Sequence, residues 1–129
     1  MESFLRDNNI QQIYISSNLD INNTFFKNIK INIYSSNEEN TLFFGMYNKA
    51  DYEMVEKHNG KKWILWEGND ADTTNKETVE SIKNISNVEM HIAYNEKVYN
   101  NLLNFFENVI LFDLLSNYFT NDIINENNN

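Results

Sequence analysis

The sequence predicts an α/β domain in which a mostly parallel sheet of about six strands is flanked by helices. The first observation is that strand-like and helix-like segments alternate along most of the chain. The second is that the runs 41–46 and 62–66 are almost continuously apolar, as expected for strands covered on both faces. The third is the length of 129 residues without internal repeats or a linker, which fits one domain. Together these observations predict a three-layer, Rossmann-like fold.

The first half of the chain contains three of the predicted strands, at 13–15, 29–34 and 41–46. The second of these alternates with period two, so we expect it to have one solvent-facing side and to lie near a sheet edge. Helical spacing of apolar residues predicts two helices, over 19–28 and 51–58. The dipeptide Asn59-Gly60 follows, and we expect it to supply a left-handed C-terminal cap.

The second half of the chain continues the alternation with three further predicted strands, at 62–66, 88–93 and 109–112. Thr74 and Glu77 have capping-box spacing, which predicts that a helix begins there. Asn95 is predicted to cap the next helix, because the apolar residues after it recur at helical spacing. A last helical turn is predicted within 114–119.

Composition and charge exclude several classes of partner. The net charge of −9 disfavours nucleic acid and anionic membranes, whose recognition requires clustered Lys and Arg. The absence of cysteine excludes a disulfide framework and a cysteine-based zinc site. The chain shows no signal peptide and no membrane-spanning apolar run. We therefore expect a cytoplasmic protein with one domain over 1–124 and a disordered, Asn-rich tail over 125–129.

The candidate site follows from the rule that ligands of open parallel sheets bind outside the carboxyl ends of the strands. Three predicted loops lie at such ends, over 16–18, 47–49 and 67–72. Gly45 and Gly68 stand at strand ends, where the lack of a side chain allows a close approach or a tight turn. The sequence has no Gly-x-Gly-x-x-Gly fingerprint and no Walker motif, so we predict no cofactor.

Asp70 and Asp72 match two patterns of functional carboxylates. The sequence from Asp70 to Thr74 fits Asp-x-Asp-x-Thr of haloacid dehalogenase phosphatases, in which the first Asp attacks phosphorus beside Mg²⁺. The pair also fits the Asp-x-Asp motif that holds a divalent cation in one class of glycosyltransferases. The simpler interpretation is that both carboxylates favour the positive end of the following helix. We assign no metal site and keep a Mg-dependent phosphatase as the third hypothesis.

The histidines and the aromatic residues near the strand ends are weaker candidates. His58 ends a predicted helix, and His91 lies in a predicted buried strand, where a core histidine is expected. Tyr47, Trp66 and Tyr94 lie near strand ends and could form an aromatic platform for a sugar ring. Packing in the core and at the rim is the alternative interpretation of these three residues.

Four short motifs between residues 41 and 106 carry a family resemblance. They are Phe44-Gly45-Met46-Tyr47, His58-Asn59-Gly60-Lys61-Lys62, Gly68-Asn69-Asp70 and His91-Ile92-Ala93. In order and spacing they resemble the N-terminal domain of family-4-type glycosyltransferases of the GT-B fold. The resemblance implies an acceptor-side domain whose cleft rim is formed by the residues Gly45, Tyr47, Gly68, Asn69 and Asp70.

Two departures from that family limit what the resemblance implies. Glu67 stands where the family has the first Gly of Gly-Gly-Thr-Asp, and Asn69 replaces the Thr. The given sequence also ends where the linker to a second, nucleotide-sugar-binding domain would begin. The first hypothesis is therefore a glycosyltransferase half that binds a sugar acceptor and is inactive without a separate donor-binding chain. The alternative is a non-catalytic binding or interaction module on the same fold, and a homodimer is compatible with both.

Overall fold

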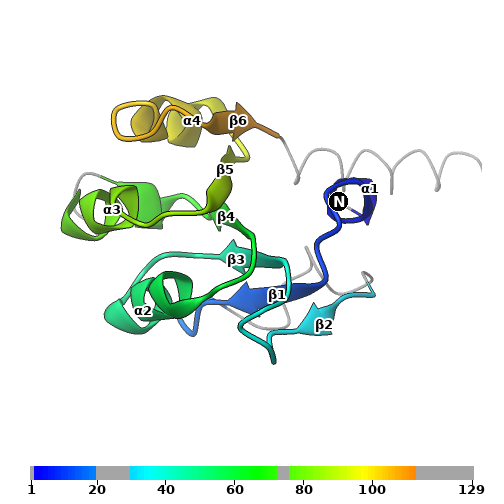
Figure 1. Ribbon diagram of the computed structural model, residues 1–129. Helices are drawn as coiled ribbons and strands as arrows, with labels where there is room; N and C mark the ends of the chain where they lie inside the picture. The colour runs from blue at the N-terminus through cyan, green and yellow to red at the C-terminus, as the bar shows by residue number, and fades with distance from the viewer. Residues whose placement is uncertain (1, 20–29, 73–75, 113–129) are drawn as a thin grey trace, which may run out of the picture.

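One six-stranded sheet organises the domain in the computed structural model, which describes residues 2–19, 30–72 and 76–112 (Figure 1). The strands are β1 (Gln12–Ile15), β2 (Asn32–Ile33), β3 (Thr41–Phe44), β4 (Lys62–Trp66), β5 (Val88–Ala93) and β6 (Val109–Leu111). Their order is β2-β1-β3-β4-β5-β6, and every neighbouring pair is parallel. The predicted α/β class with a parallel sheet of about six strands is confirmed.

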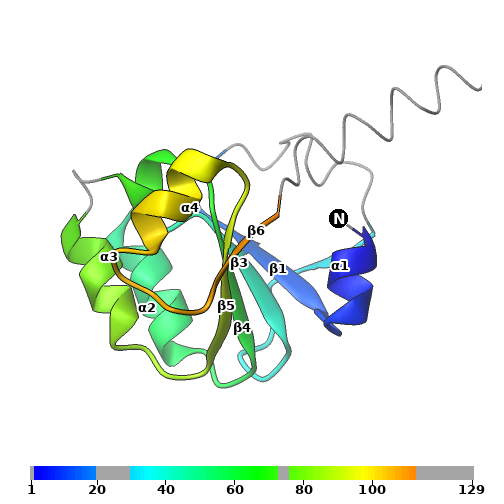
Figure 2. The same ribbon diagram turned by 90° about the horizontal axis from the view of Figure 1, so that it is seen from above.

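Helices cover both faces of the sheet and complete the three layers. They are α1 (Glu2–Asp7), α2 (Lys49–Lys57), the 3-10 turn η1 (Asn69–Ala71), α3 (Lys76–Lys83) and α4 (Glu96–Leu102). Figure 2 shows α2, α3 and α4 side by side on one face and α1 on the other. Helix α1 is absent from the sequence-based prediction, because six residues with few apolar positions give almost no helical periodicity.

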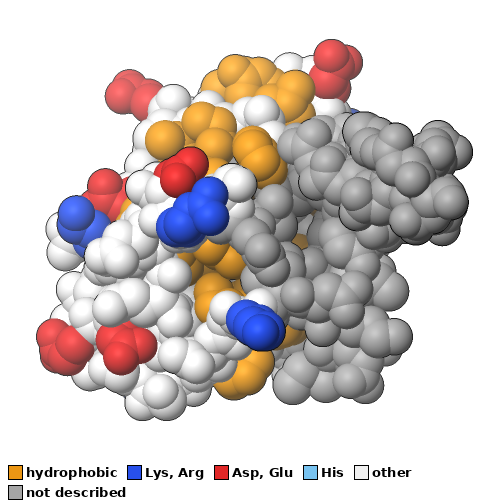
Figure 3. Space-filling model, turned by 90° about the vertical axis from the view of Figure 1, so that its right-hand side faces the viewer, with side chains coloured by type: hydrophobic (Ala, Val, Ile, Leu, Met, Phe, Trp, Pro, Cys, Tyr) orange, Lys and Arg blue, Asp and Glu red, His pale blue; other side chains and the backbone are white. Residues whose placement is uncertain are grey.

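The core is divided into two apolar clusters by the sheet. The cluster beneath α2, α3 and α4 includes Phe43, Ile64 and Trp66, and that on the α1 side includes Leu42 and Leu65. Adjacent strand residues therefore contribute to opposite clusters, as the alternation of side chains along a strand requires. Figure 3, viewed toward the α1 side, shows apolar side chains gathered along the middle of that face.

The central strands are buried as the apolar runs predict. Every residue of β3 and β4 is buried, including Lys62, which is only 3% exposed. Its ammonium group donates to the carbonyl oxygen of Ser86 at 3.4 Å, and burial lowers its pKa. Strand β2 lies at the edge of the sheet, so the predicted edge position of the 29–34 segment is confirmed. The predicted single solvent-facing side is wrong, because the strand is limited to Asn32–Ile33 and both residues are exposed.

The connection from β2 to β3 runs over residues 34–40 without a helix and crosses β1. Gln12 of β1 fixes this crossing, because its side chain is fully buried and its amide is fully used. Its Oε1 accepts from the backbone N–H groups of Ser35 and Ser36 at 2.9 and 3.2 Å. Its Nε2 donates to Thr41 Oγ1 at 2.7 Å and to the Ser36 carbonyl oxygen. A parallel crossover this short needs such anchoring, since its backbone has no helical hydrogen bonds.

The predicted left-handed cap at Asn59-Gly60 is wrong. Helix α2 ends at His58 in an extended conformation, and neither of the two following residues has a positive φ. Gly60 is required for a different reason. A Cβ atom there would lie 2.5 Å from the carbonyl oxygens of both Glu38 and Glu39, so only glycine lets the 34–40 crossing approach.

The remaining sequence-based predictions have mixed outcomes. Helix α2 begins at Lys49, two residues earlier than predicted, because Asn48 and Asp51 form a reciprocal capping box. The predicted cap of α4 is confirmed, since Asn95 Oδ1 accepts from the Val98 N–H at 2.9 Å. The predicted helices at 19–28 and 114–119, the Thr74 cap and the tail lie wholly or largely outside the described residues.

Candidate functional site at the carboxyl edge of the sheet

The three loops predicted to share one rim do meet at the carboxyl ends of β1, β3 and β4. Asn48, after β3, donates its side-chain N–H to Asn18 Oδ1, after β1, at 2.7 Å. The backbone N–H of Met46, also after β3, donates to Asp70 Oδ2, after β4, at 2.9 Å. The strand order reverses between β1 and β3, so this rim includes the position where ligands of doubly wound sheets bind.

Asp51 occupies the centre of the crevice between β1 and β3 with its own carboxylate. Its Oδ1 accepts from the Tyr14 hydroxyl at 2.7 Å, and its Oδ2 accepts from the Ser16 hydroxyl at 2.6 Å. Oδ2 also accepts from the backbone N–H groups of Tyr47 and Asn48 at 2.9 and 3.2 Å. Burial, and then the bond to Asp51, raise the pKa of Tyr14. The backbone N–H groups of Tyr47 and Asn48, which directly precede α2 and could otherwise bind an anion, are thus satisfied internally.

Asp70 holds the loops after β3 and β4 together from beneath the surface. Its oxygens accept from the backbone N–H groups of Gly68 at 2.8 Å, Met46 at 2.9 Å and Glu67 at 3.2 Å. The residue is 0% exposed. Burial raises the pKa of this carboxyl, while the three N–H donors act in the opposite direction. A phosphatase nucleophile needs an oxygen facing substrate, and neither oxygen of Asp70 reaches the surface.

Gly45 and Tyr47 also face protein rather than open space. Gly45 has a φ of +91°, and a Cβ there would lie 2.9 Å from both Ser16 Cβ and Leu19 Cδ1. The glycine therefore permits contact between the loops after β1 and β3. The hydroxyl of Tyr47 donates to Glu67 Oε2, and burial followed by this bond raises the pKa of Tyr47.

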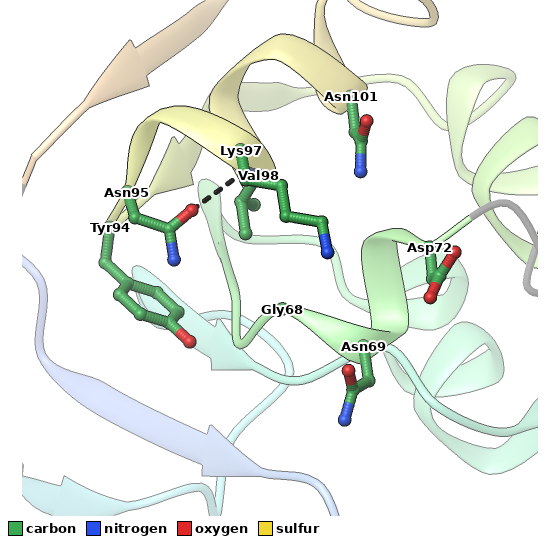
Figure 4. Close-up of a pocket in the computed structure, with 8 residues that line it drawn as sticks. All are labelled: Gly68, Asn69, Asp72, Tyr94, Asn95, Lys97, Val98 and Asn101. Atoms are coloured by element: carbon green, nitrogen blue, oxygen red, sulfur yellow. Dashed lines mark hydrogen bonds between the residues drawn. The ribbon is translucent and has the colours of Figure 1, made fainter.

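A cavity of about 180 Å³ opens at the carboxyl ends of β4 and β5. Its lining residues are Gly68, Asn69, Asp72, Tyr94, Asn95, Lys97, Val98 and Asn101 (Figure 4). Of the five residues predicted for the site, Gly68 and Asn69 line this cavity, whereas Gly45, Tyr47 and Asp70 support the rim beside it. The cavity therefore moves the candidate site toward α4.

The cavity presents hydrogen-bonding groups of several kinds around a small apolar floor. Figure 4 shows Lys97 reaching from α4 across the opening, with Asn101 on the same helix and Asp72 on the opposite wall. Tyr94 stands beside Gly68, where a Cβ atom would lie 3.2 Å from the Tyr94 hydroxyl oxygen. Burial, followed by the nearby Glu67 and Asp70 carboxylates, raises the pKa of Tyr94. The Tyr94 hydroxyl is therefore protonated at neutral pH and acts as a hydrogen-bonding group.

Half of the lining residues were missed as site residues by the sequence-based prediction, namely Asn95, Lys97, Val98 and Asn101. The loop after β5, which contains Tyr94 and Asn95, lies at the carboxyl end of a parallel strand just as the three predicted loops do. Lys97 and Asn101 follow at positions four apart on α4 and thus share one face of that helix. The signal that identifies them is a predicted helix that starts directly after a predicted buried strand.

Both histidines serve the core, as predicted for His91. The indole N–H of Trp66 donates to His91 Nδ1 at 3.0 Å, and the imidazole stacks on Phe106 with ring centroids 3.7 Å apart. Burial lowers the pKa of His91 to about 3. His58 contacts the Tyr34 hydroxyl through Nδ1 at 2.9 Å, and burial lowers its pKa as well. Of the two interpretations of Tyr47, Trp66 and Tyr94, packing rather than an aromatic platform holds for Trp66, because its side chain is fully buried in the core.

The described ranges contain neither a cluster of metal-ligating side chains nor a membrane-spanning helix. Within residues 2–19, 30–72 and 76–112, no group of three or more His, Cys, Asp and Glu side chains has an arrangement that could hold a metal ion. No helix in this part of the chain combines the length and apolar character needed to cross a membrane.

The fold and the rim define a Rossmann-like α/β domain with a small polar cavity at the carboxyl edge of its sheet. Comparison of the chain with protein-family models, with curated proteins and with solved structures finds no match. The resemblance to the N-terminal domain of GT-B glycosyltransferases therefore stays a prediction.

Proposed function

We propose that this chain is a carbohydrate-binding domain that corresponds to the acceptor-side half of a GT-B-like glycosyltransferase. The observation that carries the proposal is the cavity between η1 and α4, at the carboxyl ends of β4 and β5. Three carboxamides line it, from Asn69, Asn95 and Asn101. A carboxamide both donates and accepts hydrogen bonds, and so does every hydroxyl group of a sugar.

The size of the cavity favours a small ligand. Sites that enclose drug-sized molecules span roughly 300–1,000 Å³. A volume of about 180 Å³ corresponds to one sugar ring, with the rest of a longer glycan extending into solvent. The ring of Tyr94 adds an aromatic edge of the kind that sugar-binding sites use beside their polar groups.

Transfer of a sugar requires a bound nucleotide-sugar donor, and the sequence has no phosphate-binding motif for one. The Asp51 and Asp70 carboxylates are buried and bonded to protein donors, and the two histidines belong to the core. On the proposed assignment, a separate nucleotide-sugar-binding domain or chain provides the donor site, and this chain alone is inactive. A non-catalytic interaction module is the second candidate, and the same internal satisfaction of both carboxylates favours it.

Isothermal titration calorimetry with four probes tests the proposal. The probes are a monosaccharide panel, a disaccharide panel, UDP and UDP-glucose. We expect saturable binding of a saccharide and none of UDP, because the first strand-to-helix turn lacks a phosphate cradle. Binding of UDP without any saccharide would overturn the acceptor-side assignment, and binding of neither class would leave the interaction module.

A matched pair of variants locates the binding. Asn101→Ala removes a carboxamide that lines the cavity and should weaken saccharide binding about tenfold. Asn104→Ala removes the same group from the exposed turn after α4 and should leave the affinity unchanged. Equal effects of the two substitutions would place the saccharide elsewhere.

A further inference from the structure

A second, apolar cavity of about 310 Å³ opens near the β2 edge of the sheet, beside β1, β2 and α2. The described residues that line it are Tyr14, Ile15, Ile33, Tyr34 and Met54, none of them charged. It opens where the helical layer ends, because the connection from β2 to β3 contains no helix. Its volume lies at the lower end of the range of small-molecule sites.

The two tyrosine hydroxyls of this cavity are already used by the protein. The Tyr14 hydroxyl donates to Asp51 Oδ1 at 2.7 Å. His58 Nε2 lies 2.6 Å from the Glu39 carbonyl oxygen, which can only accept, so Nε2 carries the proton. His58 Nδ1 therefore accepts from the Tyr34 hydroxyl at 2.9 Å. The cavity thus offers ring faces and aliphatic groups, and a charged or highly polar ligand would lose its hydration there without compensation.

The arrangement of the two rings selects a shape of ligand. The Tyr14 and Tyr34 ring centroids are 6.1 Å apart, and the ring planes meet at 87°. A third aromatic ring placed against one of them in a stacked geometry presents its edge to the other, and both arrangements are favourable. Met54 adds a polarizable thioether, which also favours contact with aromatic rings.

We propose that this cavity binds an uncharged, single-ring aromatic molecule against the perpendicular rings of Tyr14 and Tyr34. The site is next to the reversal of strand order between β1 and β3, where doubly wound sheets bind ligands. It is distinct from the polar cavity beside α4 and does not rest on the proposed carbohydrate-binding function.

Methyl NMR of the full chain labelled at methionine tests the assignment, with phenol as the probe and cyclohexanol as a non-aromatic ring of similar size. Phenol should shift the Met54 methyl signal saturably at millimolar concentration, because the bound ring's magnetic anisotropy acts on that methyl. The signals of Met46 and Met90, which do not line the cavity, should not follow the same titration curve. Cyclohexanol should bind more weakly than phenol.

Two exposed apolar residues on opposite edge strands provide matched variants. Ile33 of β2 is 58% exposed and lines the cavity, whereas Leu111 of β6 is 45% exposed and lies at the other edge. Ile33→Asp should weaken phenol binding roughly tenfold, and Leu111→Asp should leave it unchanged. A Met54 signal that does not respond to phenol, or that responds equally to cyclohexanol, would overturn the proposal. Equal effects of the two substitutions would do the same.

Discussion

His91 makes the stability of this domain depend on pH in a way that a single substitution can isolate. The imidazole is 2% exposed, accepts the Trp66 indole N–H and stacks on Phe106. Burial lowers its pKa to about 3, whereas the unfolded chain has the ordinary value near 6.5. The unfolded state therefore takes up a proton first as the pH falls. The stability that neutral His91 provides is complete above pH 6.5 and is lost progressively down to about pH 3.

The expected magnitude follows from that difference in pKa. Each pH unit below 6.5 costs about 1.4 kcal/mol, so at about pH 5 the loss from His91 amounts to roughly 2 kcal/mol. His91→Phe preserves an aromatic partner for Phe106 but leaves the buried Trp66 N–H without its acceptor, which costs about 1–3 kcal/mol at neutral pH. The variant does not titrate at this position. The difference in free energy of unfolding should therefore shrink or change sign as the pH falls.

Urea denaturation followed by tryptophan fluorescence at about pH 7.5 and pH 5 measures both free energies of unfolding. The lower value stays above the isoelectric point of 4.6, where solubility is poorest. Carboxylates elsewhere titrate equally in the wild type and the variant, so the difference between the two proteins isolates His91. A gap between wild type and His91→Phe that is the same at both pH values would refute a buried, neutral histidine at this position.

Two further substitutions test the buried contacts at the two ends of the sheet. Asp70→Ala removes the acceptor of three backbone N–H groups and should lower the free energy of unfolding by about 3 kcal/mol or more, measured by urea denaturation. An effect no larger than that of Asp7→Ala, whose side chain is 72% exposed, would contradict this role. Gly60→Ala forces a Cβ atom against the carbonyl oxygens of Glu38 and Glu39 and should lower the midpoint of thermal unfolding by roughly 3–10 °C, measured by calorimetry. An unchanged midpoint would show that the 34–40 connection can move away from the added atom.

The layered fold could be predicted because the sheet imposes a simple pattern on the sequence. The runs that form β3 and β4 are apolar at every position after the first, and apolar clusters lie on both faces of the sheet. The edge position of β2 could also be predicted, from the alternation of apolar and polar residues before Tyr34. The order of the strands could not be predicted, because it depends on which connection crosses β1. That crossing is determined by tertiary contacts such as those of Gln12.

The location of the candidate site could be predicted from the sequence, but only two of its lining residues were predicted to belong to it. Location follows from the carboxyl ends of parallel strands, so Gly68 and Asn69 were found. Asp70 follows them directly in sequence, yet its carboxylate turns inward to the amides that its own turn exposes. Sequence spacing does not distinguish a carboxylate that faces a ligand from one that satisfies backbone N–H groups, because both need the same loop.

The position of both cavities follows from the way the crevice between β1 and β3 is filled. Asp51 places its carboxylate against the N–H groups of Tyr47 and Asn48 directly before α2, and the loop after β1 packs against Gly45. A ligand phosphate would have to displace a buried carboxylate that holds four hydrogen bonds, which is more costly than binding to open surface. Among the described residues, one cavity lies on each side of this crevice. The side toward β5 exposes loop amides and a helix face and is polar, whereas the side toward β2 exposes strand side chains and is apolar. The Asp51 carboxylate therefore closes the usual site, and the two cavities beside it differ in chemistry because different elements line them.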